Sequence, residues 1–403
     1  MNFAAFRRLM FQFHMWIGLI LGLLLAILGL SGSILVYDNA VLDMMAPRAT
    51  AQGAPLPLDK IVDAARSVAG RGQVQITLPG APGEAVSVRV TQPRAGEGAR
   101  GADRGEARGE GRGQRRAAEG QQAGPQAGPP RQTATQVFID PVSGAVLGSQ
   151  RAGLPPALMF AHQLHGNFLM GREGRQFVGW LGVAMLILGV TGLVLWWPKR
   201  GQWKYAFLVR RTAKGLRFHR ELHAATGIWI FVIFMIVSFS GVVIAFPNMF
   251  GMTGGGQAGP NAFNFREGPE IEAVAGATPI RAEDAIAMAR KALPNATATG
   301  ITLPSRRDRT IMVNMEAKVG VGATVYIDPW RGQVVATRDP SASVMAWQRP
   351  LHQGSGLGLI WQFLVFLSGL VPVLFVFTGV VMWLKKRKRH IPMSAVLAEE
   401  AVG

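Results

Sequence analysis

The chain has 403 residues, of which 49% are hydrophobic and only 16% are charged. Soluble domains carry about 25% charged residues, so this composition is typical of a membrane protein. The chain has no cysteine, which excludes c-type haem attachment, disulfides, cysteine-ligated iron–sulfur clusters and thiol catalysis. Its net charge of +18 lies mostly beside apolar segments and in one low-complexity stretch, and no nucleic-acid-binding motif is present. We therefore expect no nucleic-acid partner.

Four apolar runs, each preceded by a histidine, dominate the chain. A membrane-spanning helix needs about 20 mostly apolar residues, and each run supplies them. An ionisable ring at a membrane face is costly, so its presence indicates function. The histidines are His14, His165, His223 and His352, and the runs are 17–36, 177–197, 228–246 and 359–384.

Basic residues set the expected topology. Lys and Arg gather in the short segments 199–220 and 385–390, as they do in cytoplasmic loops. We therefore expect both termini in the cytoplasm and two long outer loops. The predicted segments are 1–37 (N-terminus and first spanning helix), 38–158 (first outer domain), 159–198 (second spanning helix), 199–218 (basic connector), 219–246 (third spanning helix), 247–350 (second outer domain), 351–384 (fourth spanning helix) and 385–403 (basic tail).

The first outer domain has its own local patterns. Residues 58–68 predict a short amphipathic helix, and 73–79 and 85–90 predict strands. Residues 136–148 predict a strand, a turn at Asp140 and a second strand. Asp328 occupies the same kind of turn, and turn formation explains both carboxylates better than cation binding does. Residues 92–131, mostly Gly, Ala, Arg, Gln and Pro, predict a disordered insert.

The chain contains an internal duplication. His14 and Ser31-Gly32 match His223 and Ser240-Gly241 at an offset of 209. His165 and Thr191-Gly192 match His352 and Thr378-Gly379 at an offset of 187. Two tandem repeats with the same topology predict a two-fold arrangement about the membrane normal. The matched small-residue pairs predict close helix packing.

This symmetry predicts two histidine pairs, one near each membrane face. It brings His14 opposite His223 and His165 opposite His352. Imidazoles that face each other across a helix bundle, in a chain without cysteine, indicate bis-histidine haem b. The neighbouring aromatic residues are expected to pack against a porphyrin; they are Phe13, Trp16, Phe168 and Trp361.

Two further histidines leave alternatives open. His162 and His219 share a helix face with His165 and His223, so a three-histidine zinc, copper or iron site is compatible with the spacing. Their repeat equivalents are Arg349 and Met10, so neither belongs to the repeated pattern. We treat His162 and His219 as secondary candidates: as alternative haem ligands, as neighbours that tune a redox site, or as interfacial polar residues. The interfacial role is favoured for His219, which lies in a basic segment. A purely interfacial role for all the histidines is less favoured, because four of them occur in matched pairs.

The motifs FHMWIGL, LHGNFLMG, LHAATGIW and LHQGSGLG, with two IDP…G segments, resemble those of the PepSY-associated transmembrane family. The resemblance covers the chain except the insert 92–131. It implies an α-helical protein of the bacterial inner membrane, with four transmembrane helices in two tandem repeats. Each repeat would carry a periplasmic α+β PepSY-like domain. It also implies two b haems, the inner one on His14 and His223 and the outer one on His165 and His352.

The same resemblance implies a transmembrane, haem-dependent ferric-siderophore reductase. Electrons would pass to periplasmic ferric siderophore from quinol or from a separate reductase, since the chain has no GxGxxG after a predicted strand. A non-catalytic sensor or assembly protein is the alternative, and a siderophore or metal transporter is less favoured because the apolar runs lack carboxylates. The pairs lie near opposite faces of a core about 30 Å thick, which is a long gap for electrons. We therefore expect the porphyrins to extend inward or an aromatic such as Trp180 to help.

Overall fold

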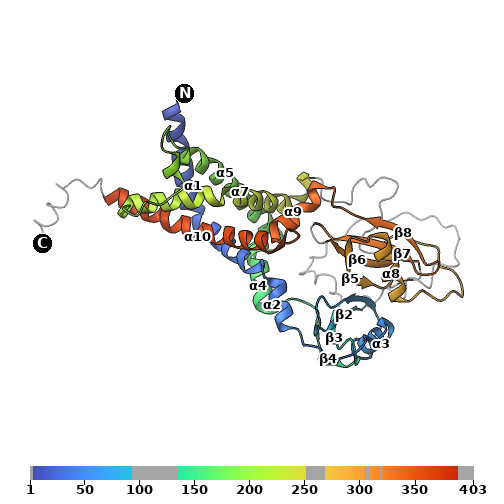
Figure 1. The fold of residues 1–403 in the computed structure, drawn as a ribbon. Coiled ribbons are helices and arrows are strands. Elements are labelled where there is room, and N and C mark those ends of the chain that lie inside the picture. Colours follow the sequence, from blue (N-terminus) through green and yellow to red (C-terminus); the bar gives the residue numbers. More distant parts are fainter. Residues whose placement is uncertain are drawn as a thin grey trace, which may run out of the picture.

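The computed structural model describes residues 3–92, 134–250, 268–304, 306, 308–317 and 320–388. A helix bundle lies at one end of the molecule and a sheet domain at the other (Figure 1). Four helices of the bundle are long and apolar enough to cross a membrane, so the chain is a multi-pass membrane protein. They are α1 (Phe3–Leu35), α5 (Gly171–Trp196), α7 (Gly215–Ala245) and α10 (Gly358–Lys388).

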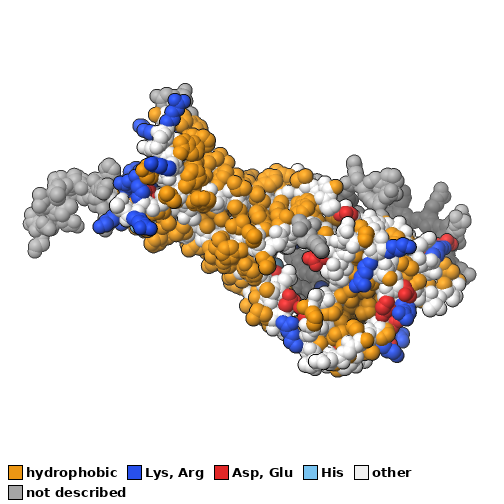
Figure 2. Space-filling model, viewed as in Figure 1, with side chains coloured by type: hydrophobic (Ala, Val, Ile, Leu, Met, Phe, Trp, Pro, Cys, Tyr) orange, Lys and Arg blue, Asp and Glu red, His pale blue; other side chains and the backbone are white. Residues whose placement is uncertain are grey.

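Apolar side chains cover the bundle, and charged ones gather beyond it (Figure 2). The start of α1 and the end of α10 both lie at the end of the bundle away from the sheet (Figure 1). Lys and Arg side chains cluster there (Figure 2), so we call this the basic end and the opposite one the sheet end. The prediction that the N-terminal and C-terminal segments lie on one side agrees with this arrangement. The short helix α6 (Trp203–Ala206) lies in the basic connector.

Small residues let two of the helices approach closely. A Cβ at Gly29 of α1 would lie 2.4 Å from the carbonyl oxygen of Gly369 of α10. Four residues further along α1, the hydroxyl of Ser33 donates to the carbonyl of Phe366 at 2.8 Å. Helix contacts in membranes favour such residues because backbones can then pack directly. α1 packs against α5 and α10, and α7 packs against the same two helices, so the four form a ring.

The sheet domain is one antiparallel sheet of eight strands in the order β4-β3-β2-β1-β5-β6-β7-β8. Each half contributes a meander of four strands, and α3 and α8 cover one face with a shared apolar core. The predicted helix and strands of the first outer domain are confirmed. The elements are α3 (Leu58–Ala69), β1 (Gln73–Thr77), β2 (Val86–Thr91), β3 (Ala134–Ile139), β4 (Val146–Arg151), α8 (Ala282–Ala292), β5 (Ala296–Thr302), β6 (Ile311–Ala317), β7 (Ala323–Asp328) and β8 (Gln333–Arg338).

The two halves join between β1 and β5. Ile76 and Ile301 are direct partners there, and both begin an ITLP sequence. The flanking backbone hydrogen bonds are reciprocal. The Leu78 N–H donates to the Thr299 carbonyl, and the Leu303 N–H donates to the Val74 carbonyl, each at 2.9 Å. The sequence predicted two outer domains but not their junction, because strand pairing between distant segments leaves no local pattern.

Two predicted spanning segments each contain two helices rather than one. The segment 159–198 begins in α4 (Pro156–Asn167), which ends before α5 at Phe168 and Leu169, both with positive φ. The segment 351–384 likewise begins in α9 (Val344–Gln353), separated from α10 by a turn with Gly354, Gly356 and Gly358 at positive φ. His165 and His352 therefore lie on short helices of their own. The other short helices are α2 (Asp38–Met45) and the 3-10 helix η1 (Pro247–Phe250).

The Asp-Pro turns are structural, as predicted. Asp140 accepts hydrogen bonds from the backbone N–H groups of Val142 and Ser143 within its turn, and from Thr50 and Ala51 of the preceding loop. Asp328 accepts from Trp330 and Arg331. These bonds use the carboxylate oxygens to close the turns between β3 and β4 and between β7 and β8. The predicted insert 92–131 lies, except for Gln92, outside the described residues, as does most of the tail 385–403.

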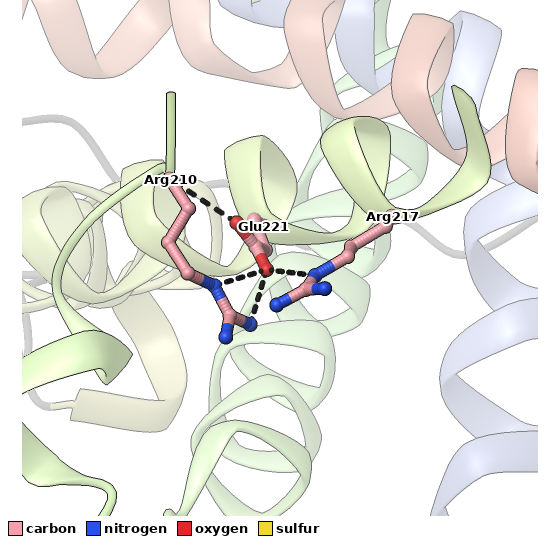
Figure 3. Close-up of polar contacts among 3 residues, drawn as sticks. All are labelled: Arg210, Arg217 and Glu221. Carbon is pink, nitrogen blue, oxygen red and sulfur yellow. Dashed lines mark hydrogen bonds and ion pairs between the residues drawn. The ribbon is translucent and has the colours of Figure 1, made fainter. Parts of the chain in front are cut away.

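The basic connector is held to α7 by one buried carboxylate (Figure 3). Glu221 accepts hydrogen bonds from the guanidinium groups of Arg210 and Arg217 and from the backbone N–H of Arg210. Its side chain is only 9% exposed. In the sequence the connector is a run of positive charge. The sequence did not reveal that the Glu221 carboxylate, from the start of α7, neutralises part of that charge.

Candidate cofactor sites in the helix bundle

The basic end holds the first predicted histidine pair. His14 of α1 and His223 of α7 face each other with ring centroids 6.1 Å apart and an interplanar angle of 76°. Nδ1 of His14 lies 2.9 Å from the hydroxyl oxygen of Thr191 on α5. Nδ1 of His223 lies 2.8 Å from the hydroxyl oxygen of Thr378 on α10. Each threonine belongs to a matched Thr-Gly pair of the predicted repeat.

These hydrogen bonds fix the tautomer of both rings. The Thr191 hydroxyl donates its single proton to the Ile187 carbonyl at 2.7 Å, and the Thr378 hydroxyl donates to Leu374 at 2.8 Å. Each hydroxyl oxygen must then accept from the histidine, so Nδ1 carries the proton. The lone pair is left on Nε2, the form in which a histidine binds a metal while its other nitrogen is held by a neighbour.

The sheet end holds the second pair. The rings of His165 on α4 and His352 on α9 have centroids 5.8 Å apart and an interplanar angle of 39°. Nδ1 of His165 donates to the Leu28 carbonyl of α1, and Nδ1 of His352 donates to the Val237 carbonyl of α7, each at 2.9 Å. A carbonyl oxygen can only accept, so these two rings also keep the lone pair on Nε2.

Glycines make room for the sheet-end rings. A Cβ on Gly32 would lie 2.6 Å from Cε1 of His165, and one on Gly241 would lie 2.8 Å from Cε1 of His352. At the basic end, a Cβ on Gly192 would lie 3.3 Å from Cε1 of His14. The matched Ser-Gly and Thr-Gly pairs were interpreted only as helix-packing residues. Three of their glycines also seat imidazoles, whereas a Cβ on the fourth, Gly379, would meet nothing within 4 Å. The matching offsets of histidines and small residues could have indicated this role.

The pair geometry fits a metal held between two imidazoles. A metal bound about 2 Å from each ligating nitrogen places the two ring centroids roughly 6 Å apart. Both observed separations agree with this value. Among the described residues, no group of three or more His, Cys, Asp or Glu side chains could hold a metal ion. The three-histidine site that the spacing left open is therefore not formed in the described part of the chain.

A cavity of about 860 Å³ opens beside the basic-end pair. It is lined by His14, His223 and mostly apolar side chains, and Leu25 and Phe234 mark its inner limit. Cofactor pockets are typically apolar, with a few well-placed polar groups, and have volumes of about 300–1,000 Å³. The cavity therefore has the size and lining expected for a large planar cofactor bound by this pair.

The aromatic residues around this cavity differ from those expected. Phe13 and Trp16 are each 50% exposed and do not line it. They neighbour His14 in sequence, but on a helix the residues three and four positions away share its face. Phe11 and Gly18 stand at those positions and do line the cavity. The helical period could have identified them.

The aromatic residues expected at the sheet end also have other roles. Phe168 packs edge-on against Phe177, with ring centroids 5.6 Å apart, within an apolar cluster of α1 and α5. The indole of Trp361 donates to the Leu351 carbonyl at 3.3 Å. Trp180 is 65% exposed and packs against Phe246. Trp180 therefore faces outward from the bundle, which gives no support to the expectation that it helps electrons cross between the two sites.

The two secondary histidines lie apart from the facing rings. Nε2 of His162 is 3.0 Å from the Asp38 carboxylate at the start of α2, so that ring is already paired. His219 packs edge-on against Phe218 and Phe377, and its Nδ1 is buried without a hydrogen-bond partner. Neither ring takes part in the two facing pairs.

A family model described as the PepSY-associated TM region matches residues 11–386. The chain belongs to this family. The match begins before His14 and ends after α10 passes Thr378, so it includes both histidine pairs and the whole sheet domain. No curated protein matches the chain.

Membership of the PepSY-associated transmembrane family confirms the resemblance seen in the four histidine motifs. It also agrees with the four apolar helices, since both indicate a multi-pass membrane protein. Within this family member, each facing ring comes from a different helix. Each pair therefore exists only in the assembled bundle.

Proposed function

We propose that this protein carries electrons across the bacterial inner membrane between two bis-histidine haem b sites, and that ferric siderophore accepts them at the sheet end. The observation that carries the proposal is the pair of facing imidazoles at each end of the bundle, with centroids 6.1 Å and 5.8 Å apart. All four rings have Nδ1 hydrogen-bonded, which leaves Nε2 for a metal. A chain without cysteine offers no thiolate as an alternative axial ligand.

The proposed orientation places the basic end in the cytoplasm and the sheet domain in the periplasm. The support is the clustering of Lys and Arg at one end of the bundle (Figure 2). The proposed architecture is two tandem repeats, supported by the same order of elements in both halves and by the reciprocal bonds between β1 and β5. Reporter fusions at Gly201 and Gly276 test the orientation. A cytoplasmic-type signal at Gly276 contradicts it.

The residues of the bundle would hold and orient the cofactors. His14 and His223 would bind one haem, and His165 and His352 the other. Haem supplies one-electron transfer, and the protein tunes it through the axial ligands and their hydrogen bonds. Thr191 and Thr378 keep the basic-end rings in the ligating tautomer. The carbonyls of Leu28 and Val237 do the same for the other pair.

The two sites are far apart along the helices. His14 lies on α1 eighteen residues before Gly32, which seats His165, and a helix rises about 1.5 Å per residue. That rise gives a separation of roughly 27 Å along the axis. The basic-end cavity reaches inward as far as Leu25, eleven residues past His14, which shortens the remaining gap. The depth of this cavity supports a cofactor that extends inward, rather than an aromatic residue such as Trp180, as the means of shortening the gap.

The acceptor and the donor rest on the family resemblance. Ferric siderophore is proposed as the acceptor at the sheet end, with one electron reducing each ferric ion to the ferrous state. Quinol or a separate reductase is proposed as the donor, because the sequence has no nicotinamide or flavin motif. The bundle itself supplies the route between them.

Spectroscopy of the purified protein tests this function. We expect two b haems per chain in a pyridine haemochrome assay, and bands that respond to dithionite. Adding ferric siderophore to the reduced protein anaerobically should reoxidise the haems, whereas iron-free siderophore should not. A colourless preparation would contradict the proposal and favour the sensor or assembly alternative. If the haems stay reduced after ferric siderophore is added, the protein transfers electrons to another acceptor.

A further inference from the structure

Four cations line the mouth of the cavity that contains His14 and His223. They are Arg7 and Arg8 of α1, Arg220 of α7 and Lys386 of α10, and we call them the basic rim. The lining of this cavity contains no acidic residue. It is therefore amphiphilic, with an apolar interior, two imidazoles and a positively charged mouth.

Two members of the rim lie on the same helix faces as the histidines. Arg220 is three residues before His223, and Arg7 is seven residues before His14. Residues three, four or seven apart share one face of a helix, and seven residues span about 10 Å. These two cations therefore stand about one and two helical turns from the imidazoles, on the side of the basic end.

Three members of the basic rim are available for a ligand. The guanidinium of Arg7 donates to the Leu195 carbonyl at the end of α5, so it is partly used. Among the described residues, none forms a salt bridge with Arg8, Arg220 or Lys386; the ammonium of Lys386 lies 5.3 Å from the centre of the Phe11 ring.

The predicted repeat sharpens this observation. Arg217 of α7 is the repeat equivalent of Arg8, and it forms a salt bridge at 2.9 Å with Glu221, a carboxylate that it shares with Arg210 (Figure 3). Glu221 in turn corresponds to Gln12, so the first half lacks the neutralising acid. Arg8 therefore keeps its charge at the cavity mouth, while Arg217 does not contribute to the rim.

We propose that the basic rim binds the propionate carboxylates of the haem held by His14 and His223. The inference rests on the proposed function and adds the orientation of that haem, with its carboxylate edge toward the basic end. Haem is an apolar disc with two carboxylates on one edge, which matches a cavity with an apolar interior and a cationic mouth. Arg–carboxylate hydrogen bonds are short and strong, and they strengthen further where apolar walls exclude water. Lipid phosphates could contact the same cations, so the test must separate the two sources of negative charge.

The test compares haem with its dimethyl ester, which has the same ring but no free carboxylate. Apo-protein is reconstituted with each, in the wild type and in a His352→Ala background that keeps only the basic-end pair. Dissociation is followed by transfer to apomyoglobin for haem, and by loss of the bound spectrum for the ester. We expect the ester to leave about ten times faster than haem, because it cannot form charge-assisted hydrogen bonds with the rim; a tenfold change corresponds to about 1.4 kcal/mol.

Variants assign this difference to the rim. In Arg8→Gln/Arg220→Gln, haem should dissociate roughly tenfold faster, while the ester should be little affected. The midpoint potential of the basic-end haem should fall, because removing nearby positive charge favours the ferric state. The matched control is Arg211→Gln/Lys214→Gln, which removes two charges of the connector outside the cavity and should change neither quantity.

The outcomes separate this inference from the proposed function. Equal dissociation of haem and ester from the His352→Ala protein, which keeps only the basic-end pair, overturns the propionate assignment, even if the rim variant fails to fold. The same measurement in nanodiscs tests the lipid alternative. If phosphatidylglycerol changes the haem dissociation rate while haem and its ester still dissociate equally, the rim binds lipid phosphates and the propionate assignment is overturned. A wild-type protein that binds no haem b overturns the proposed function and this inference together.

Discussion

Nδ1 of His14 donates a hydrogen bond to the hydroxyl oxygen of Thr191, 177 residues away in the chain, at 2.9 Å. The threonine accepts because its own proton is given to the Ile187 carbonyl. One side chain thereby fixes both the tautomer and the orientation of a proposed ligand. Thr378 does the same for His223 on the other side of the bundle.

We expect Thr191→Val to weaken haem binding at the basic end. Valine has nearly the same shape but cannot accept the Nδ1 proton, so the ring loses its fixed tautomer. Loss of such a supporting group typically lowers metal affinity by about 10–100-fold. Haem titration of the apo-protein measures the effect, and Thr191→Ser, which keeps the hydroxyl, should restore most of it. Equal affinity in the valine and serine variants would contradict the role given to the hydroxyl.

Gly32→Ala should displace His165 from the sheet-end pair. The new Cβ would lie 2.6 Å from Cε1 of that ring, a separation that requires the imidazole or the helix to move. We expect loss of the sheet-end haem with the basic-end haem retained. Gly166→Ala is the matched control, because it lies beside His165 on α4 and its Cβ would meet nothing within 4 Å. The measurement is the haem stoichiometry of both variants. Equal haem content in Gly32→Ala and Gly166→Ala would show that the close approach of Gly32 to His165 is unimportant.

The four main histidines should fall into two classes. His14→Ala and His223→Ala should each remove the same haem, because one remaining imidazole cannot hold a six-coordinate low-spin iron. The double variant should lose no more haem than either single one, since residues that act as a unit are not additive. His165→Ala and His352→Ala should behave alike at the other site.

The secondary histidines supply the control for this series. His162 is paired with Asp38 and His219 lies outside the facing rings, so alanine at either position should leave the haem count unchanged. A redox titration of each variant also shows which of the two haems is lost. Retention of both haems in His165→Ala together with loss of one in His162→Ala would refute the assignment at the sheet end.

Glu221→Gln should loosen the connector from α7. Glu221 accepts from two guanidinium groups and one backbone N–H, and glutamine cannot replace the charge-assisted bonds (Figure 3). We expect a loss of about 1–3 kcal/mol in the free energy of unfolding, seen as a lower thermal midpoint in detergent. Glu316→Gln, at an exposed position of strand β6, should leave the midpoint unchanged. An equal effect of both substitutions would mean that the buried cluster adds no stability.

Asp140 should stabilise the sheet domain at neutral pH. Backbone N–H groups of Ser143, Ala51 and Val142 hold the pKa of its carboxyl well below the usual range. A depressed folded-state pKa gives stability that is present above the unfolded value of about 3.9 and is lost as the pH falls toward the folded one. Asp140→Asn should therefore lower the thermal midpoint at pH 7 and equally at pH 5, and the difference should shrink only below about pH 4. Asp63→Asn is the exposed control, and a difference that vanished already at pH 5 would contradict this origin.

The sequence by itself determined the membrane helices and the identity of the paired histidines. An apolar run of sufficient length forms a helix in lipid because every backbone group must be bonded within its own segment. That constraint is local, so it is visible without a structure. The repeat offsets then matched His14 with His223 and His165 with His352, and the structure brings both pairs face to face.

Only the tertiary structure decided what surrounds those rings. Thr191 and Gly32 contact histidines from other segments of the chain. Ile76 and Ile301, whose pairing joins the two halves of the sheet, are more than two hundred residues apart in the chain. The break between α4 and α5 depends on left-handed Phe168, a conformation that phenylalanine adopts only where its packing imposes it. Contacts between distant segments depend on how helices and strands assemble. They leave no periodic signal in either partner, and for that physical reason the sequence revealed the paired histidines but not the groups that hold them.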